Sequence, residues 1–225
     1  MAMAPRKAST LTRDDWADAA LEAIGRGGLA AVAVEPLAAH LGATKGSFYW
    51  HFRNRAALVE AALQRWESAH TEAVIAMVEQ EEDGIARLRL LFRTVFEHSD
   101  DPIEVAMLAT ADHPVVAPVL SRVTARRMSY TVGLFAALGF GDEEARDRGQ
   151  LAIAAYLGHV QLAHATPQLV ERSAEDATAY ADLVVAVLTA DLPGSPAPGG
   201  RRHGRGAVGA VEPDVGSANR PTHPR

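Results

Sequence analysis

The side chains best suited to contact a polyanion lie close together in residues 43–55. This stretch contains Gly46 and a dense set of hydroxyl, cationic and aromatic residues, namely Thr44, Lys45, Ser47, Tyr49, Trp50, His51 and Arg55. Hydroxyl, ammonium and guanidinium groups donate hydrogen bonds to phosphate oxygens and sugar edges. An outward face made of these residues therefore indicates contact with nucleic acid.

Two short helices joined by a tight turn are expected to position these residues. Thr44 can cap a helix over residues 44–50, because its hydroxyl can accept a hydrogen bond from a free amide of the first turn. Phe48 stands at helical spacing from the apolar residues on either side, which predicts that it faces inward. A helix over residues 34–41 precedes it, and Gly42 can end that helix in the left-handed conformation. The pair is a helix-turn-helix, whose second helix enters the major groove of DNA.

The end of this stretch predicts a second site for an anion. Asn54 reads as the cap of the next helix and Arg55 as its first residue, so free amides and a guanidinium would meet there. The alternative is an ordinary helical hairpin in which Phe48, Trp50 and Phe52 are all core residues.

Residues 42–55 closely resemble the TetR family of bacterial transcriptional regulators, and the similarity extends over roughly residues 12–63. The resemblance implies phosphate contacts by Tyr49, His51 and Arg55. It also implies contacts with bases or the flanking backbone by Thr44, Lys45, Gly46 and Ser47. The chain departs from the family pattern before the turn, where Glu35 replaces the basic phosphate ligand of some relatives. Glu35 is therefore not expected to contact DNA.

The whole chain is expected to be all-α, with a three-helix head joined by a long helix to a helical bundle. Helical periodicity predicts helices over residues 13–25, 34–41, 44–50, 55–79, 85–96, 103–111, 114–138, 142–165 and 173–190. The predicted domains are a flexible arm (1–11), a DNA-binding domain (12–55), a ligand-binding and dimerisation domain (56–191) and a disordered tail (192–225). The tail is rich in proline and glycine, which favours disorder.

Charge is distributed unevenly along the chain. Residues 1–55 hold 7 Lys and Arg against 5 Asp and Glu, residues 56–190 hold 10 against 20, and residues 191–225 hold 5 against 3. A slightly basic head on an acidic body permits DNA binding despite the net charge of −6. The chain has no cysteine, no signal-peptide pattern and no apolar run approaching the ~18 residues of a membrane span. We therefore expect a cytoplasmic protein that contacts no membrane.

Two sets of residues in the body are candidates for binding. Large or polarisable side chains that could line an effector pocket are Phe92, Phe96, Met107, Met128, Tyr130, Phe135, Tyr156 and His159. Small and apolar residues that would let the last helices meet a second copy are Ala155, Gly158, Leu162, Tyr180, Leu183, Val184 and Val187. Each set has an alternative role as ordinary core.

Catalytic and metal-binding patterns find little support. The sequence has no phosphate loop, no Gly-x-Ser-x-Gly elbow and no His-Glu-x-x-His motif. Glu67 and His70 have the spacing of a di-iron ligand pair, but no second pair accompanies them. We predict a non-enzyme without cofactor or metal: a homodimeric regulator, most often a repressor in this family, that binds palindromic or pseudo-palindromic double-stranded operator DNA and an unknown small-molecule effector. The alternative is a helical small-molecule binding protein or enzyme with a vestigial head.

Overall fold

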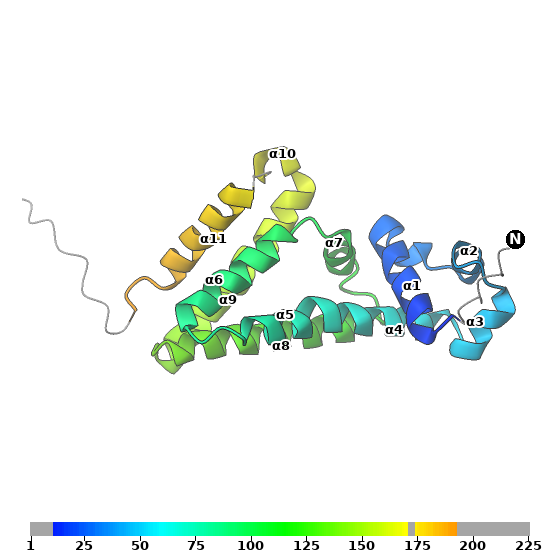
Figure 1. Ribbon diagram of the computed structural model, residues 1–225, viewed down its shortest axis with the longest axis horizontal. Coiled ribbons are helices and arrows are strands. Elements are labelled where there is room, and N and C mark those ends of the chain that lie inside the picture. Colours follow the sequence, from blue (N-terminus) through cyan, green and yellow to red (C-terminus); the bar gives the residue numbers. More distant parts are fainter. Residues whose placement is uncertain (1–10, 171–173, 193–225) are drawn as a thin grey trace, which may run out of the picture. The chain divides into compact units, whose positions relative to one another are not determined.

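The computed structural model describes residues 11–170 and 174–192, and every regular element within them is helical (Figure 1). This confirms the prediction of an all-α chain. The predicted flexible arm, apart from Leu11, and the predicted tail beyond Leu192 lie outside the described residues.

Four helical elements form the head: α1 (Arg13–Gly27), a 3-10 turn η1 (Leu29–Ala31), α2 (Val34–His40) and α3 (Lys45–His51). The side chain of Thr12 accepts from the amide of Asp15, whose carboxylate accepts from the amide of Thr12, so α1 begins with a capping box. α1 runs two residues beyond its predicted end at residue 25, and Gly28 follows it with φ +66°, a backbone conformation that favours glycine.

A helical run connects the head to the rest of the chain in three segments: α4 (Arg55–Glu67), a π-helical turn η2 (Ser68–Glu72) and α5 (Ala73–Val78). The sequence predicted one regular helix over residues 55–79, and that prediction is wrong over η2. A π turn contains one more residue than a regular α-helical turn, so the side chains that follow it point in a different direction around the helix axis. It therefore changes which residues of the run face the body.

The body consists of α6 (Gly84–Glu97), α7 (Pro102–Ala109), α8 (Ala117–Ala137), α9 (Asp142–Ala165), α10 (Pro167–Val170) and α11 (Ala174–Leu188). All but the short α10 were expected. α8 begins three residues late, because the His113 carbonyl accepts from the amides of Val116 and Ala117 in a turn that precedes the helix.

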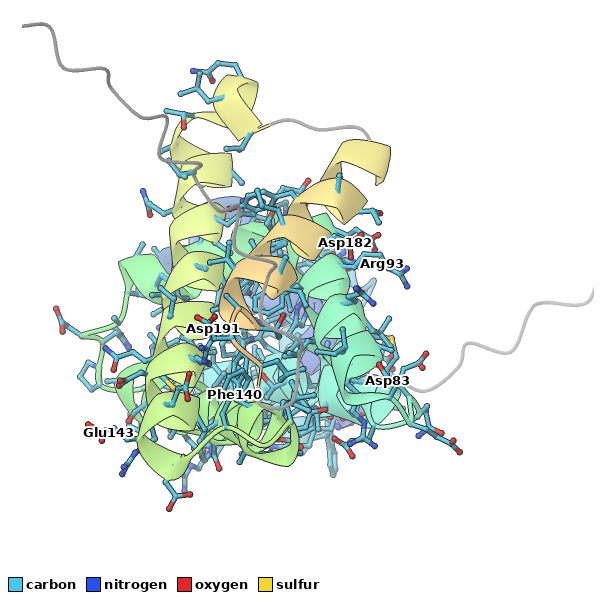
Figure 2. The ribbon with its side chains drawn as sticks, turned by 90° about the vertical axis from the view of Figure 1, so that its left-hand side faces the viewer. Asp83, Arg93, Phe140, Glu143, Asp182 and Asp191 are labelled. Carbon is cyan, nitrogen blue, oxygen red and sulfur yellow. The ribbon has the colours of Figure 1, made fainter. Side chains whose placement is uncertain are left out.

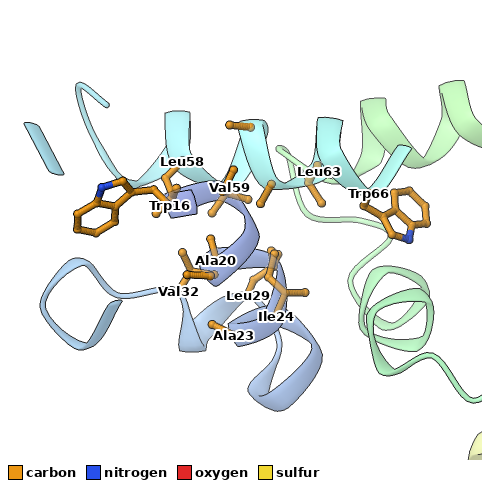
Figure 3. Close-up of a cluster of buried hydrophobic side chains, with 14 of the residues drawn as sticks. Trp16, Ala20, Ala23, Ile24, Leu29, Val32, Leu58, Val59, Leu63 and Trp66 are labelled. Atoms are coloured by element: carbon orange, nitrogen blue, oxygen red, sulfur yellow. The ribbon is translucent and has the colours of Figure 1, made fainter. Parts of the chain in front are cut away.

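One buried cluster runs from the head along α4 and into α7 and α8. Figure 3 shows Trp16 and Trp66 toward opposite ends of α4 in this cluster. The head also touches α7, since a Cβ atom added to Gly25 of α1 would lie 3.1 Å from Ile103. The head and the start of the body thus share one core.

A second buried cluster joins α6, α8, α9 and α11 around Leu88, Phe92 and Phe135. α11 packs mainly on α6, and Figure 2 shows Arg93 of α6 and Asp182 of α11 on these neighbouring helices. Among the described helices, none is long and apolar enough to cross a bilayer.

Candidate nucleic-acid interface and effector cavity

Aromatic packing anchors α3 to the head. Phe48 is fully buried and Phe52 is 3% exposed. Trp16 of α1 meets the Phe48 ring edge-on at a centroid distance of 5.5 Å, and Phe52 stacks on the Phe48 ring at 5.7 Å. Burying two phenylalanines fixes how α3 is rotated, and hence which of its residues face solvent.

The opposite side of α3 projects from the protein. Trp50 is 88% exposed and Tyr49 is 57% exposed, while Lys45 and Gly46 are also exposed. The hairpin alternative is therefore wrong for Trp50, which is not a core residue. Ser47 and His51 are half-buried at the edges of this face.

The turn before α3 has the geometry expected from the sequence. Gly42 has φ +63°, a conformation that favours glycine, and the Thr44 hydroxyl accepts from the amide of Ser47 at 3.2 Å. α2 and α3 thus form a helix-turn-helix that presents the first turn of α3 and its exposed aromatics together.

Lys45, the first residue of α3, is not a free cation. Its ammonium group lies 2.7 Å from Glu35 Oε1 on α2, and both side chains are mostly exposed. The hydrogen bond to Lys45 lowers the pKa of Glu35 and raises that of Lys45. Glu35 stands where some relatives have a basic phosphate ligand, but its pairing with Lys45 was not apparent from the sequence, because the two residues are ten positions apart on different helices.

Arg55 plays a structural part that the sequence did not reveal. Its Nε donates to the Val32 carbonyl at 2.5 Å and its Nη2 to the Leu29 carbonyl, so the guanidinium ties the start of α4 to η1. Asn54 caps α4 as predicted, accepting from Ala57 at 2.9 Å. A phosphate contact by Arg55 stays a prediction, and it would have to use the donors that the two carbonyls leave.

A cavity of about 60 Å³ lies between the α4–α5 run, α6, α8 and α9. Phe92, Tyr130 and Tyr156, three of the predicted pocket residues, line it together with residues of η2 and α5. An adjoining hollow of about 310 Å³ shares His70, Val74, Val95 and Tyr156 with the cavity and reaches Met77 and His98.

The other predicted pocket residues lie elsewhere. Met107 is fully buried in the core under the head, and Phe135 is fully buried against Phe140. Met128 lines a shallow hollow on α8, and Phe96 and His159 face a separate hollow near α10 with Tyr180. Residue type alone did not separate these places, because large apolar side chains suit a core and a cavity equally.

Arg127 of α8 organises one wall of the cavity, a role that no sequence pattern indicated. Its Nη1 and Nη2 donate to the two Glu104 carboxylate oxygens at 2.8 and 3.2 Å, and its Nε donates to Thr71 Oγ1 at 3.0 Å. Burial alone would disfavour its charge, but Glu104 and Tyr156 together outweigh this and raise the pKa of Arg127. Only tertiary contacts bring α7, η2 and α8 together at this point.

The predicted dimer residues fall into two groups. Leu162, Leu183 and Val187 are at least half exposed, and Gly158 is also exposed, so α9 and α11 present apolar surface to solvent. Ala155, Tyr180 and Val184 are half-buried, and the last two pack against the second buried cluster. Leu151 of α9, 54% exposed, extends the apolar surface and was not predicted.

The metal-like spacing of Glu67 and His70 has a different explanation. Glu67 accepts from Arg122 Nε at 2.8 Å, and His70 Nδ1 lies 3.2 Å from Asp101 Oδ2. Within the described residues, no three His, Asp or Glu side chains gather as metal ligands would.

Residues 17–62 match the family model described as bacterial regulatory proteins of the tetR family. The HTH-type transcriptional regulator TtgR of Pseudomonas putida is 34% identical over 86 residues, which cover 38% of this chain and 41% of that protein. The match thus spans less than half of that curated relative.

Solved structures share the fold over most of the chain. A TetR-family transcriptional regulator from Streptomyces coelicolor superposes with a TM-score of 0.64 at 19% identity, covering 84% of this chain and 98% of that one. FadR from Bacillus subtilis, solved in complex with stearoyl-CoA, gives 0.63 at 16% identity, with 80% and 98% covered. The segment that matches the tetR family of bacterial regulatory proteins, residues 17–62, contains the helix-turn-helix of α2 and α3.

Proposed function

We propose that this chain is a cytoplasmic, homodimeric transcriptional repressor that binds operator DNA in a sequence-specific way and is released by a small-molecule effector. The exposed face of α3 carries the proposal. Phe48 is fully buried beneath it, while Tyr49, Trp50 and Lys45 project into solvent. Such a helix, held rigidly by its inner side, suits insertion into a major groove.

The contacts follow from where each side chain stands on α3. Thr44, Lys45, Gly46 and Ser47 occupy the first turn or its cap, which approaches base edges when such a helix enters the groove. The side chains of Tyr49, Trp50, His51 and Arg55 are proposed to meet the sugar-phosphate backbone.

Dimerisation is proposed to use the exposed apolar surface of α9 and α11. Leu162, Leu183 and Val187 would bury this surface against a second copy. A two-fold axis there would place two heads on a palindromic or pseudo-palindromic operator, with half-sites about 34–36 Å apart.

The cavity offers a route from effector to head. His70 and Thr71 of η2 line it, and η2 continues directly from α4, whose first residue Arg55 is tied to η1. A molecule that binds the cavity better when the two heads are wrongly spaced would weaken DNA binding by its differential affinity.

Selection from a random duplex library with the purified full chain tests this function. We expect one enriched symmetric sequence, bound with an affinity whose logarithm falls linearly with the logarithm of salt concentration. Tyr49→Ala should weaken binding to every duplex, whereas Lys45→Ala should also relax sequence preference.

Two results would contradict the proposal. If no sequence is enriched and the chain binds only small molecules, the vestigial-head alternative is correct. If a sequence is enriched but Tyr49→Ala binds it as tightly as the unaltered chain, α3 is not the DNA-contacting element.

A further inference from the structure

The cavity beside η2 has walls that are almost entirely apolar. Its aliphatic and aromatic lining includes Val74, Ile75, Leu91, Phe92, Val95 and Ile153. An apolar wall gains most from covering apolar surface of a ligand, and it offers nothing to replace the water that a charged group would lose.

The arginine and the histidine at the cavity each lie against a carboxylate. Arg127 donates to both oxygens of Glu104, with side-chain exposures of 15% and 4%. His70 Nδ1 lies 3.2 Å from Asp101 Oδ2. The Arg127–Glu104 pair is closed and nearly buried, so it leaves no uncompensated positive charge for an anionic ligand.

The hydroxyl groups at the cavity are also neutral and engaged. Tyr130 donates to Glu79 at 2.8 Å, and Thr131 donates to the Arg127 carbonyl at 2.8 Å. Burial raises the pKa of Tyr130 and Tyr156, so both phenols keep their protons. In the adjoining hollow, His98 Nδ1 lies 2.8 Å from the Thr94 carbonyl.

From this lining we infer that the cavity takes a small, electrically neutral and mainly apolar molecule, and that it rejects carboxylates of the same shape. The cavity of about 60 Å³ would hold a compact apolar group, and the adjoining hollow of about 310 Å³ would hold the remainder. This deepens the proposed function, because it names the chemical class of the effector and rests on that proposal only for the effect on DNA.

Nitrobenzene and benzoate test the inference, since they have nearly the same shape but differ by one negative charge. Isothermal titration calorimetry on the full-length chain without DNA is expected to show nitrobenzene binding at least about tenfold more tightly than benzoate. Equal affinities, or tighter binding of benzoate, would overturn the inference.

Glu104→Gln tests the reason for the selectivity. This change leaves the Arg127 charge without its carboxylate, and benzoate can then supply one. We expect benzoate to gain about tenfold or more in affinity and to raise the melting temperature of the variant. Glu67→Gln is the matched control, because Glu67 of α4 pairs with Arg122 of α8 and neither residue lines the cavity. This substitution should leave the affinities for nitrobenzene and benzoate unchanged.

A double variant covers the case in which Glu104→Gln does not fold. Glu104→Gln with Arg127→Met removes both charges together, and buried ion pairs replaced as a unit often leave stability intact. It should still prefer nitrobenzene by about tenfold. A preference for benzoate in this variant would show that the apolar lining does not disfavour a carboxylate, and it would overturn the inference.

Val95→Phe shows where the probe binds. Val95 is half-buried and lines both the cavity and the hollow, so a larger ring there should abolish nitrobenzene binding. Unchanged binding would place the ligand elsewhere and overturn the inference. These titrations contain no DNA. If nitrobenzene binds as expected but no operator sequence is enriched in the duplex selection, the proposed function is refuted while the inferred class of ligand remains supported.

Discussion

The ammonium group of Lys45, the first residue of α3, lies 2.7 Å from Glu35 Oε1, so Lys45 is already paired with a negative charge in the absence of DNA. Both side chains are mostly exposed, and exposed ion pairs are weak enough to exchange for other partners. A phosphate anywhere along a duplex must compete with Glu35 for Lys45. The pair therefore limits how much this cation contributes to binding of unrelated DNA.

Replacing Glu35 by glutamine is expected to increase affinity for unrelated duplex DNA. Lys45 would then be free for a phosphate, and each neutralised phosphate adds about 0.9 to the slope of log affinity against log salt. We predict a gain of about threefold to tenfold at low salt and a slope steeper by about one. Fluorescence anisotropy over a salt series with a random-sequence duplex measures both.

Glu22→Gln separates this local effect from a general change in charge. Glu22 also lies in the head, but it pairs with Arg26 at 3.3 Å and with His40 at 3.7 Å, neither of which is on α3. The substitution should change the slope by much less than one. Equal effects of the two substitutions would show that only the net charge of the head matters.

Arg55 gives a second prediction, which concerns stability. Arg55→Ala leaves the Val32 and Leu29 carbonyls without their donors, and we expect a loss of about 1–3 kcal/mol in the free energy of unfolding. Arg53→Ala, at an exposed arginine two positions earlier, should change it by less than about 0.5 kcal/mol. Urea unfolding followed by circular dichroism compares the two variants. Equal stabilities would mean that the hydrogen bonds of Arg55 to these two carbonyls add nothing to the free energy of unfolding.

Local chemistry made much of the head predictable from sequence. The capping box at Thr12, the caps at Thr44 and Asn54 and the left-handed Gly42 each depend on neighbours within three or four positions. Helical spacing likewise placed Phe48 inside. These features follow from residue type and short-range geometry alone.

The features that the sequence did not reveal depend on residues far apart in the chain. Arg127 meets Glu104 across 23 positions and Thr71 across 56, and Arg55 meets Leu29 across 26. The π turn at η2 also left no sign in the apolar pattern. Contacts of this kind form only once the helices are packed. This is why only some of the cavity-lining residues were predicted from the sequence.

Glu67 provides a prediction about pH. Its hydrogen bond from Arg122 lowers its pKa below the ordinary value of 4.5. The unfolded carboxyl group therefore takes up a proton at higher pH than the folded one. The resulting stabilisation is complete above pH 4.5 and is lost as pH falls through the lower folded pKa.

A double-mutant cycle of Glu67→Gln and Arg122→Gln isolates this effect. We expect a coupling energy below about 1 kcal/mol at pH 7 that becomes smaller as the medium is acidified to about pH 3. Unfolding measured at both pH values gives the result. A coupling energy that is the same at both pH values would contradict the assignment of the lowered pKa to this pair.

The apolar surface of α9 and α11 gives the last prediction, on assembly. Leu183 on α11 is 59% exposed, and a lysine at this position would place a charge in the proposed interface, where it would lose water without gaining a partner. We expect Leu183→Lys to weaken dimerisation by at least about tenfold, measured by analytical ultracentrifugation. Leu169→Lys is the matched control, because Leu169 on α10 is 72% exposed but lies outside α9 and α11. If Leu183→Lys dimerises as tightly as the unaltered chain while Leu169→Lys does not, the two copies meet through α10, and the two heads would be spaced by a different axis from the one proposed.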